Sequence, residues 1–219
     1  KYLPDESIYV VNGEQFNMKL TYKEDIFLLD KLFQLRSIRN QPTLLVKSDI
    51  EELHGKVVVV FGGTYGIGQE ICEICREYKT TLYVYSRSTG VDVSNSQSVR
   101  RVLSEIYEKE GRIDWIVNTA GILDKQPLAN MSYEVVHRSI DINYLGNIIV
   151  AKESFSYLKE SKGSLLFFTS SSYTRGRALY SLYSSSKAAI VNFVQALSEE
   201  WFEYDIRVNC INPERTKTP

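Results

Sequence analysis

The feature that most constrains the fold of this chain is a regular alternation of short apolar segments and longer amphipathic segments, which begins near Lys56. The apolar segments are rich in β-branched and aromatic residues, as buried strands are, whereas the segments between them have helical spacing. Strands that alternate with helices form a parallel sheet, so we predict a doubly wound α/β fold in three α/β/α layers.

The individual elements can be assigned from this alternation. The predicted strands are Lys56–Phe61, Thr81–Ser86, a very short segment at Val91–Val93, Arg112–Asn118, Ser164–Ser170 and Ile206–Ile211. The predicted helices are Gln69–Tyr78, a helix that starts at Ser94 with Gln97 as its capping-box partner, Tyr133–Lys159 and Tyr180–Tyr204.

Residues 1–48 do not follow the alternation, and we assign them to a different domain from residues 49–219. SIYVVNG is compatible with a strand and a hairpin turn. Residues 21–35 have the pattern of an amphipathic helix, with Thr21 and Glu24 as a capping box, and residues 36–43 are typical of a linker. The chain begins with Lys and ends at Pro219 without a terminal helix, so we expect a segment of a longer protein whose second domain is truncated at its C-terminal end.

Composition narrows the class of protein. Hydrophobic residues make up 43% and charged residues 24% of the chain, which is typical of soluble globular proteins. A formal net charge of −1 favours neither nucleic acid nor an anionic membrane as a partner, and no apolar run has the length of a bilayer span. Three cysteines are too few for a disulfide framework, which favours a cytoplasmic location. Cys72 and Cys75 form a C-x-x-C pair with no second pair and no nearby His. We interpret them as small apolar residues, with a redox or metal role as the alternative, and predict no metal site.

A glycine-rich turn joins the first predicted strand to the first predicted helix of the alternation. Gly62, Gly66 and Gly68 have the spacing G-x-x-x-G-x-G. Glycines at such a turn let a pyrophosphate approach the backbone, and the helix N-terminus supplies N–H donors and a positive dipole end. A sharp turn without a ligand is the alternative, but the position of the turn after the first strand favours a nucleotide site.

The end of the second strand indicates which dinucleotide the site prefers. An acidic residue there usually binds the ribose 2′-hydroxyl of NAD, but this chain has Ser86 and Arg87. A hydroxyl and a guanidinium would bind a 2′-phosphate through charge-assisted hydrogen bonds, so we predict NADP(H). The alternative is an ordinary surface arginine at a strand end.

Tyr183 stands four residues before Lys187 in a predicted helix, so the two side chains share one face. A free phenol has a pKa near 10, and a nearby cation lowers the pKa of such a group. A tyrosine activated in this way can exchange a proton with a carbonyl oxygen near neutral pH. Most Tyr/Lys pairs at this spacing lie on solvated helix faces, so other residues are needed to distinguish a catalytic pair from a surface pair. Ser170 ends one predicted strand, Asn118–Gly121 ends another, and Asn143 lies within a long helix; strand ends are where open α/β sheets contact ligands.

These residues together resemble the short-chain dehydrogenase/reductase family, whose fold is of the Rossmann type. The resemblance covers about Leu53 to Pro219. Its matches are Gly62, Gly66, Gly68, Asp92, Asp114, Asn118–Gly121, Asn143, Ser170, Tyr183, Lys187 and Ile206–Pro219.

The resemblance implies a catalytic tetrad of Asn143, Ser170, Tyr183 and Lys187. Tyr183 would be the general acid/base, Ser170 would bind the substrate oxygen, Lys187 would activate the tyrosine and hold the nicotinamide ribose, and Asn143 would anchor a water. The implied cofactor-binding residues are Gly62, Thr64, Gly66, Ile67, Gly68, Ser86, Arg87, Asp92, Val93, Asn118, Ala120, Gly121, Tyr183, Lys187, Pro213 and Thr218.

Four features depart from the family pattern. Phe61 and Thr119 stand where the family usually has Thr and Asn, and Glu214 replaces the glycine that normally follows Pro213. The helix between the second and third strands is nearly absent, so we expect an unusually open adenine side.

The N-terminal segment resembles the end of the cytidylyltransferases that make CDP-activated polyols, with Lys19 in the position of a lysine that contacts a phosphate. An ordinary helical extension is the alternative. The combination resembles bifunctional bacterial enzymes of CDP-ribitol synthesis for capsule or wall polymers. It implies reduction of D-ribulose 5-phosphate to D-ribitol 5-phosphate with NADPH. Besides Ser170, the candidate substrate-binding residues are Arg175, Arg177 and Lys125, which could equally be solvated surface charges.

Two competing functions remain: a reductase of another small carbonyl compound, and a non-catalytic Rossmann scaffold for an attached transferase. The intact tetrad argues against a scaffold. The family usually self-associates through the two longest helices, which implies a homodimer or tetramer.

Overall fold

The computed structural model describes residues 21–29 and 52–213, and the chain divides into two compact units, Lys1–Ser48 and Asp49–Pro219. In the first unit, residues 23–29 are helical. The Asp25 carboxylate accepts hydrogen bonds from the backbone N–H groups of Thr21 and Tyr22, at 2.8 and 2.9 Å. A helix is thus confirmed here, but the predicted capping box is wrong by one residue: the helix begins at residue 23, and the acidic partner is Asp25 instead of Glu24. The predictions for SIYVVNG, Lys19 and residues 36–43 lie outside the described residues.

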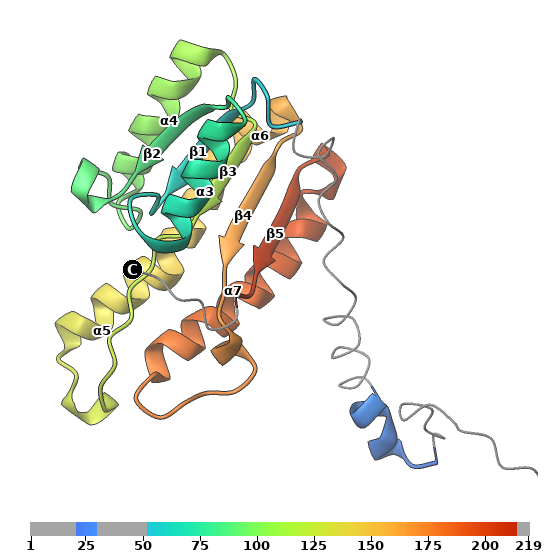
Figure 1. Ribbon diagram of the computed structural model, residues 1–219. Helices are drawn as coiled ribbons and strands as arrows, with labels where there is room; N and C mark the ends of the chain where they lie inside the picture. Colours follow the sequence, from blue (N-terminus) through green and yellow to red (C-terminus); the bar gives the residue numbers. More distant parts are fainter. Residues whose placement is uncertain (1–20, 30–51, 214–219) are drawn as a thin grey trace, which may run out of the picture. The chain divides into compact units, whose positions relative to one another are not determined.

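The second unit contains a five-stranded sheet in which every pair of neighbours is parallel (Figure 1). The strand order is β2-β1-β3-β4-β5. The strands are β1 (Val57–Phe61), β2 (Thr81–Tyr85), β3 (Trp115–Asn118), β4 (Ser164–Phe168) and β5 (Arg207–Ile211). The five longer predicted strands are thus confirmed. Val91–Val93 is not a strand; Val91 and Val93 are buried in the core without joining the sheet.

Helices cover both faces of this sheet (Figure 1). On one face, Val57, Val59 and Phe61 pack in a core with residues of three helices, whereas Val58 and Val60 point to the other face and pack against a single helix. This alternation follows from the two-residue period of a strand, and burial on both sides explains why β1 is apolar throughout. The helices are α3 (Gly66–Glu77), α4 (Ser96–Glu110), α5 (Tyr133–Ile140), α6 (Gly146–Ser161) and α7 (Ser181–Glu200), of which α3 covers one face and α4, α6 and α7 the other.

Cys72 and Cys75 belong to the core between α3 and the sheet. Burial raises the pKa of both thiols, that of Cys72 to about 11. Because the thiolate is the reactive and metal-binding form, these side chains act as small apolar residues, as the sequence indicated.

The predicted helix Tyr133–Lys159 is one helical run with a local expansion in its middle. Helix α5 leads into a π-helical turn, Asp141–Leu145, which leads directly into α6. Insertions of this kind occur frequently at functional sites, and Asn143 lies within this one.

The start of α4 differs from the prediction. Asn95 is the N-cap, and its side chain accepts the backbone N–H of Ser98 at 3.1 Å. The Ser94 hydroxyl instead donates to the Asp92 carboxylate at 2.7 Å, because the loop after Val91 turns back on itself at this point. The capping box of Ser94 and Gln97 is therefore wrong by one residue.

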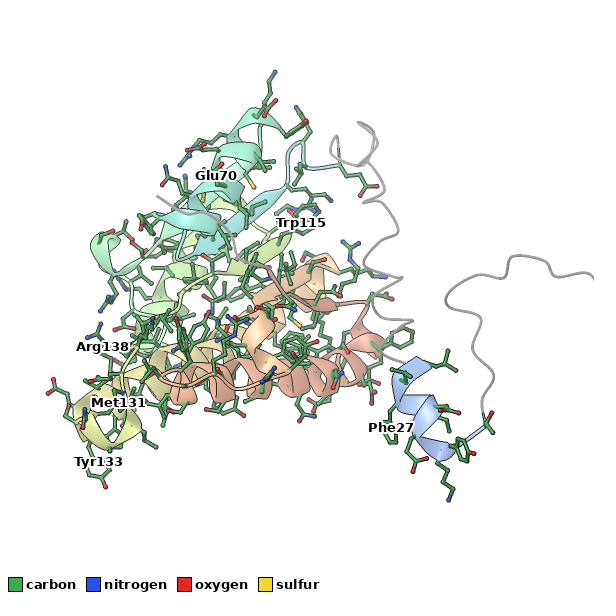
Figure 2. All side chains as sticks on the ribbon, turned by 60° about the horizontal axis from the view of Figure 1, so that its bottom comes forward. Phe27, Glu70, Trp115, Met131, Tyr133 and Arg138 are labelled. Atoms are coloured by element: carbon green, nitrogen blue, oxygen red, sulfur yellow. The ribbon has the colours of Figure 1, made fainter. Side chains whose placement is uncertain are left out.

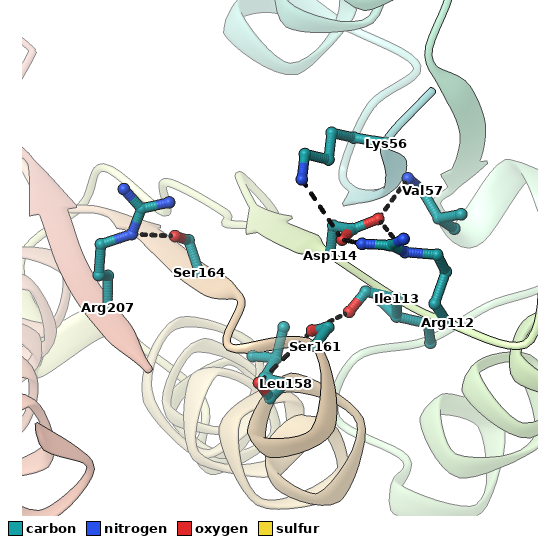
Figure 3. Close-up of polar contacts among 9 residues, drawn as sticks. All are labelled: Lys56, Val57, Arg112, Ile113, Asp114, Leu158, Ser161, Ser164 and Arg207. Atoms are coloured by element: carbon teal, nitrogen blue, oxygen red, sulfur yellow. Dashed lines mark hydrogen bonds and ion pairs between the residues drawn. The ribbon is translucent and has the colours of Figure 1, made fainter. Parts of the chain in front are cut away.

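A charged network ties the amino ends of β1 and β3 together (Figure 3). The buried carboxylate of Asp114 accepts the Val57 backbone N–H at 2.9 Å and forms a two-pronged ion pair with Arg112. The Lys56 ammonium lies 3.9 Å from the same carboxylate. This edge of the sheet is opposite the edge to which the predicted catalytic residues belong, so Asp114 has a structural role.

Candidate active site

The glycine turn between β1 and α3 packs directly against the turn that follows β3. Gly62 has a φ of +79°, and a Cβ placed on it would lie 2.5 Å from the backbone nitrogen of Ala120. A Cβ on Gly68 would lie 2.4 Å from the carbonyl oxygen of Gly62. Both positions therefore require glycine because other backbone atoms approach them closely, whether or not a ligand is bound.

Thr119 holds the two turns together. Its backbone N–H and its hydroxyl both donate to the carbonyl oxygen of Phe61, at 2.9 and 3.0 Å. The Phe61 side chain is fully buried in the core beside Tyr85. The two departures from the family pattern are thus structurally linked: Phe61 contributes to the core, and Thr119 supplies the hydroxyl that fixes the turn.

A first hollow of about 360 Å³ lies beside this turn, at the carboxyl ends of β1, β2 and β3. It is bounded by the glycine turn, by the end of β2 and by the loop that contains Asp92. Its lining residues are Gly62, Thr64, Tyr65, Ser86, Arg87, Ser88, Val91, Asp92, Val93, Thr119, Ala120, Gly121, Ile122 and Ile142.

A second hollow, of about 330 Å³, continues on the other side of the glycine turn. The two hollows share Tyr65, Thr119, Gly121 and Ile122, and the start of α3 lies between them. The residues that line the second hollow are Tyr65, Gly66, Ile67, Gly68, Thr119, Gly121, Ile122, Leu123, Phe168, Thr169, Tyr183, Lys187 and Pro213.

These hollows fit an extended dinucleotide. The start of α3 lies between them, and its N-terminus has no side-chain cap, so its backbone N–H groups can bind a pyrophosphate there. Asp92 and Arg87 lie at one end and Lys187 at the other. Such a ligand would span the glycine turn.

Lys187 is 5% exposed and lies on α7 against the end of β4. Its ammonium donates to the backbone carbonyl oxygen of Phe168 at 2.8 Å and lies 5.6 Å from the ring centre of Tyr183. Burial lowers its pKa to about 8, because a charged amine is poorly solvated inside the protein. The amine therefore remains mainly protonated at neutral pH, and a destabilised positive charge lies beside the tyrosine.

Asn143 connects the π-helical turn to the loop after β3. Its side-chain oxygen accepts the backbone N–H of Ile122 at 2.9 Å, and its amide nitrogen donates to the Ile122 carbonyl oxygen at 2.9 Å. A Cβ on Gly121 would lie 3.2 Å from the Asn143 side-chain oxygen and 3.7 Å from the Lys187 ammonium. Asn143, Gly121 and Lys187 thus converge at one point, and the role of Asn143 in anchoring a water stays a prediction.

Ser170 follows β4 and begins the loop before α7. Its hydroxyl accepts the Ser172 backbone N–H at 3.3 Å, and the neighbouring Thr169 lines the second hollow. Arg175 and Arg177 are exposed on the same loop, and Arg177 reaches the Ser171 hydroxyl at 3.5 Å.

A second segment borders this loop. The Lys125 ammonium lies 5.7 Å from the ring centre of Tyr180, and the Gln126 backbone N–H donates to the Leu179 carbonyl oxygen at 3.2 Å. Lys125 and the two arginines therefore belong to adjacent segments, but none of them lines the two hollows.

Most residues predicted to bind the cofactor line one of the hollows. Asn118 does not: it is buried, and its side chain binds Asn147 and the Ala120 backbone N–H, which shapes the turn after β3. Thr218 and Glu214 lie outside the described residues. The sequence analysis missed several lining residues that carry no motif signal of their own, namely Tyr65, Ser88, Val91, Ile122, Leu123, Ile142, Phe168 and Thr169.

A parallel sheet with a glycine turn before its first helix, and with a Tyr–Lys pair in the adjoining hollow, defines the class of dinucleotide-dependent oxidoreductase domains. Residues 87–219 match the family model described as short chain dehydrogenase, and the chain belongs to this family.

Two relatives illustrate this membership. The chain is 48% identical over all of its 219 residues to the bifunctional ribulose 5-phosphate reductase/CDP-ribitol pyrophosphorylase Bcs1 of Haemophilus influenzae, of which it spans 46%. It is 32% identical over 187 residues to an acetoacetyl-CoA reductase of an Acinetobacter species, with 75% of each chain covered. The chain thus spans about half the length of the first of these relatives.

Solved structures share the fold. Thermoplasma acidophilum aldohexose dehydrogenase superimposes with a TM-score of 0.72 at 24% identity, over 77% of this chain and 70% of that one. The 3-ketoacyl-(acyl-carrier-protein) reductase of Brucella melitensis, solved with NADH, gives a TM-score of 0.72 at 21% identity, over 76% and 78% of the two chains.

Proposed function

We propose that this chain carries the reductase site of a bifunctional enzyme that reduces D-ribulose 5-phosphate to D-ribitol 5-phosphate with NADPH. The observation that carries the proposal is the 48% identity to the Haemophilus influenzae enzyme over the whole chain, combined with the Tyr183–Lys187 pair in the second hollow. The same identity includes residues 1–48, which we assign to the C-terminal end of a cytidylyltransferase-like domain and its linker.

The dinucleotide would lie across the two hollows and supply a hydride when bound. Its pyrophosphate would lie beside Gly62, Gly66 and Gly68, which line the hollows, and Asp92 would contact its adenosine end. Ser86, Arg87 and Ser88 line the first hollow together, and the Ser86 and Ser88 hydroxyls are 2.7 Å apart. A guanidinium beside two hydroxyls suits a 2′-phosphate, which supports NADP over NAD.

The chain's own residues would move the proton. The Tyr183 hydroxyl donates a proton to the substrate carbonyl oxygen, and the resulting phenolate is stabilised by the Lys187 ammonium. The Phe168 carbonyl oxygen holds that ammonium in place, and Ser170 orients the substrate oxygen. Arg175, Arg177 and Lys125 would bind the sugar phosphate from the loops beyond the second hollow.

Self-association through α6 and α7 is part of the proposal. A largely apolar hollow of about 300 Å³ lies between these helices and is lined by Phe155, Phe193, Leu197 and Trp201, among others. A matching face on a second copy would cover it and give a homodimer or a larger assembly.

None of the helices in the described part of the chain has both the length and the apolarity of a membrane span. We propose a cytoplasmic location, because the cysteines Cys72, Cys75 and Cys210 are free thiols, as is usual in a reducing compartment.

The test is a dinucleotide-oxidation assay on the full-length protein with D-ribulose 5-phosphate. We expect NADPH to be consumed with equimolar formation of ribitol 5-phosphate, and NADH to be used less efficiently. Oxidation with acetoacetyl-CoA but not with the phosphosugar would identify a different carbonyl substrate. Dinucleotide binding without any turnover would favour a scaffold.

A further inference from the structure

The first hollow opens into a third hollow of about 450 Å³, on the side where the chain lacks a helix between β2 and the next core segment. A single 3₁₀ turn, Arg87–Thr89, occupies this connection. Arg87, Asp92 and Ile142 line both hollows, so the two hollows adjoin at these side chains. The third hollow adds Ser94, Glu134, His137, Arg138 and Asp141.

The α5–α6 helical run forms one wall of this opening. Gly146 brings the run close to the Asp92 loop, because a Cβ on Gly146 would lie only 2.9 Å from a methyl carbon of Val93. Ile142 lies one turn before Gly146, and Arg138 lies one further turn before Ile142. Arg138 therefore lines the hollow from a rigid helix, and Figure 2 shows its position on α5.

Within the described residues, the Arg138 guanidinium has neither a hydrogen bond nor an ion pair. Glu134 and Asp141 are near it in sequence and line the same hollow, yet neither is within the 4.0 Å of an ion pair with it among the described residues. Across the hollow, one oxygen of Asp92 accepts the Ser94 backbone N–H and hydroxyl, at 2.9 and 2.7 Å. The other Asp92 oxygen has no partner in the described part of the chain. A donor and an acceptor without partners thus line one opening.

Adenine presents a complementary pair of groups on its Watson–Crick edge, an amino group that donates and the N1 atom that accepts. A phosphate would suit the third hollow poorly, because its three carboxylates, of Asp92, Glu134 and Asp141, outnumber its two guanidinium groups, of Arg87 and Arg138. We propose that Arg138 is a base-recognition residue of the dinucleotide site, which donates a hydrogen bond to adenine N1 while Asp92 accepts from the amino group. Arg87, which also lines the first hollow with Ser86 and Ser88, is left for the 2′-phosphate. This inference rests on the proposed dinucleotide function.

The two arginines can be separated with four dinucleotides: NADPH, NADH and the hypoxanthine analogue of each. Hypoxanthine has an N1–H donor where adenine has an acceptor. The Arg138 guanidinium, which is also a donor, cannot form a hydrogen bond with this N1–H group. The dissociation constants would be measured by fluorescence titration of the full-length protein. We expect the wild type to bind NADPH about tenfold more tightly than its hypoxanthine analogue, the effect of a hydrogen bond to a charged group at a partly open site.

Arg138→Ala should reduce this preference for adenine over hypoxanthine by about fivefold. It should leave the preference for NADPH over NADH unchanged. Arg87→Ala is the matched control and should have the opposite effect. It should weaken the preference for NADPH over NADH and leave the preference for adenine over hypoxanthine unchanged. Both side chains are exposed, so circular dichroism should show both variants folded.

An unaltered adenine preference in Arg138→Ala would overturn the inference. A weaker preference for NADPH over NADH in that variant would also overturn the inference, because such a result would place the 2′-phosphate beside Arg138. If the expected binding pattern appears without turnover of ribulose 5-phosphate, only the proposed substrate fails. If the wild type binds no dinucleotide, both proposals fail.

Discussion

Replacing Lys187 with methionine should make the folded chain more stable near neutral pH while abolishing the proposed reductase chemistry. The amine is almost completely buried, and its pKa falls from 10.5 to about 8 in the folded state. That difference corresponds to roughly 3 kcal/mol of unfavourable free energy for keeping the charge in the folded protein. Methionine has a similar length without the charge, but it leaves the Phe168 carbonyl oxygen without its donor, at a cost of about 1 kcal/mol.

The pH dependence of this effect has a defined sign. Between about pH 8 and 10.5 the unfolded state of the wild type keeps a proton that the folded state has released. The free energy of unfolding of the wild type should therefore rise in this window through Lys187, whereas Lys187→Met lacks this contribution. The variant should be more stable by about 2 kcal/mol near pH 7, and this advantage should shrink and then reverse toward pH 10.5.

Urea unfolding at a series of pH values, followed by tryptophan fluorescence, measures this difference. Lys187→Arg is the control, because a guanidinium keeps its charge over the whole range and should lose the rise in stability between pH 8 and 10.5. The reasoning is refuted if Lys187→Met is less stable than the wild type by a constant amount at every pH. That result would mean that the ammonium is well solvated or paired in the folded protein.

Three further predictions concern the glycine turn, the Asp114 network and the loop before α7. Gly68→Ala should weaken dinucleotide binding by at least about tenfold, because its Cβ would overlap the Gly62 carbonyl oxygen; Gly176→Ala, with no atom within 4 Å of its Cβ, should be silent in the same titration. Asp114→Asn should lower the free energy of unfolding by about 1–3 kcal/mol without changing the dinucleotide dissociation constant, and a changed constant would contradict its structural role. Arg175→Ala should raise KM for ribulose 5-phosphate several-fold at unchanged NADPH affinity, and unchanged steady-state kinetics would remove Arg175 from the substrate site.

The sheet and its helices could be predicted because their signals are local. β1 is apolar at every position since both of its faces are covered, and the glycine turn follows it directly. The sequence predicts a very short strand at Val91–Val93, where two β-branched residues flank Asp92. The same residues are buried in the core beside the helical run, and burial alone does not distinguish the two outcomes.

The proximity of Tyr183 and Lys187 in the candidate site could be predicted for a similar reason, since the two residues have fixed spacing on one helix. Two properties of the site could not be read from sequence. The π-helical turn at Asn143 depends on hydrogen bonds to Ile122, twenty-one residues away. Arg138 carries no motif, and only the approach of Gly146 to Val93 brings its helix to the Asp92 loop.

The most direct test of the account is single-turnover reduction of ribulose 5-phosphate by Tyr183→Phe in the full-length protein, with NADPH affinity measured in parallel. We expect NADPH binding within about twofold of the wild type and a reduction rate lowered by at least about a hundredfold, because the proton donor is missing. A reduction rate equal to that of the wild type would contradict the assignment of Tyr183 as the proton donor.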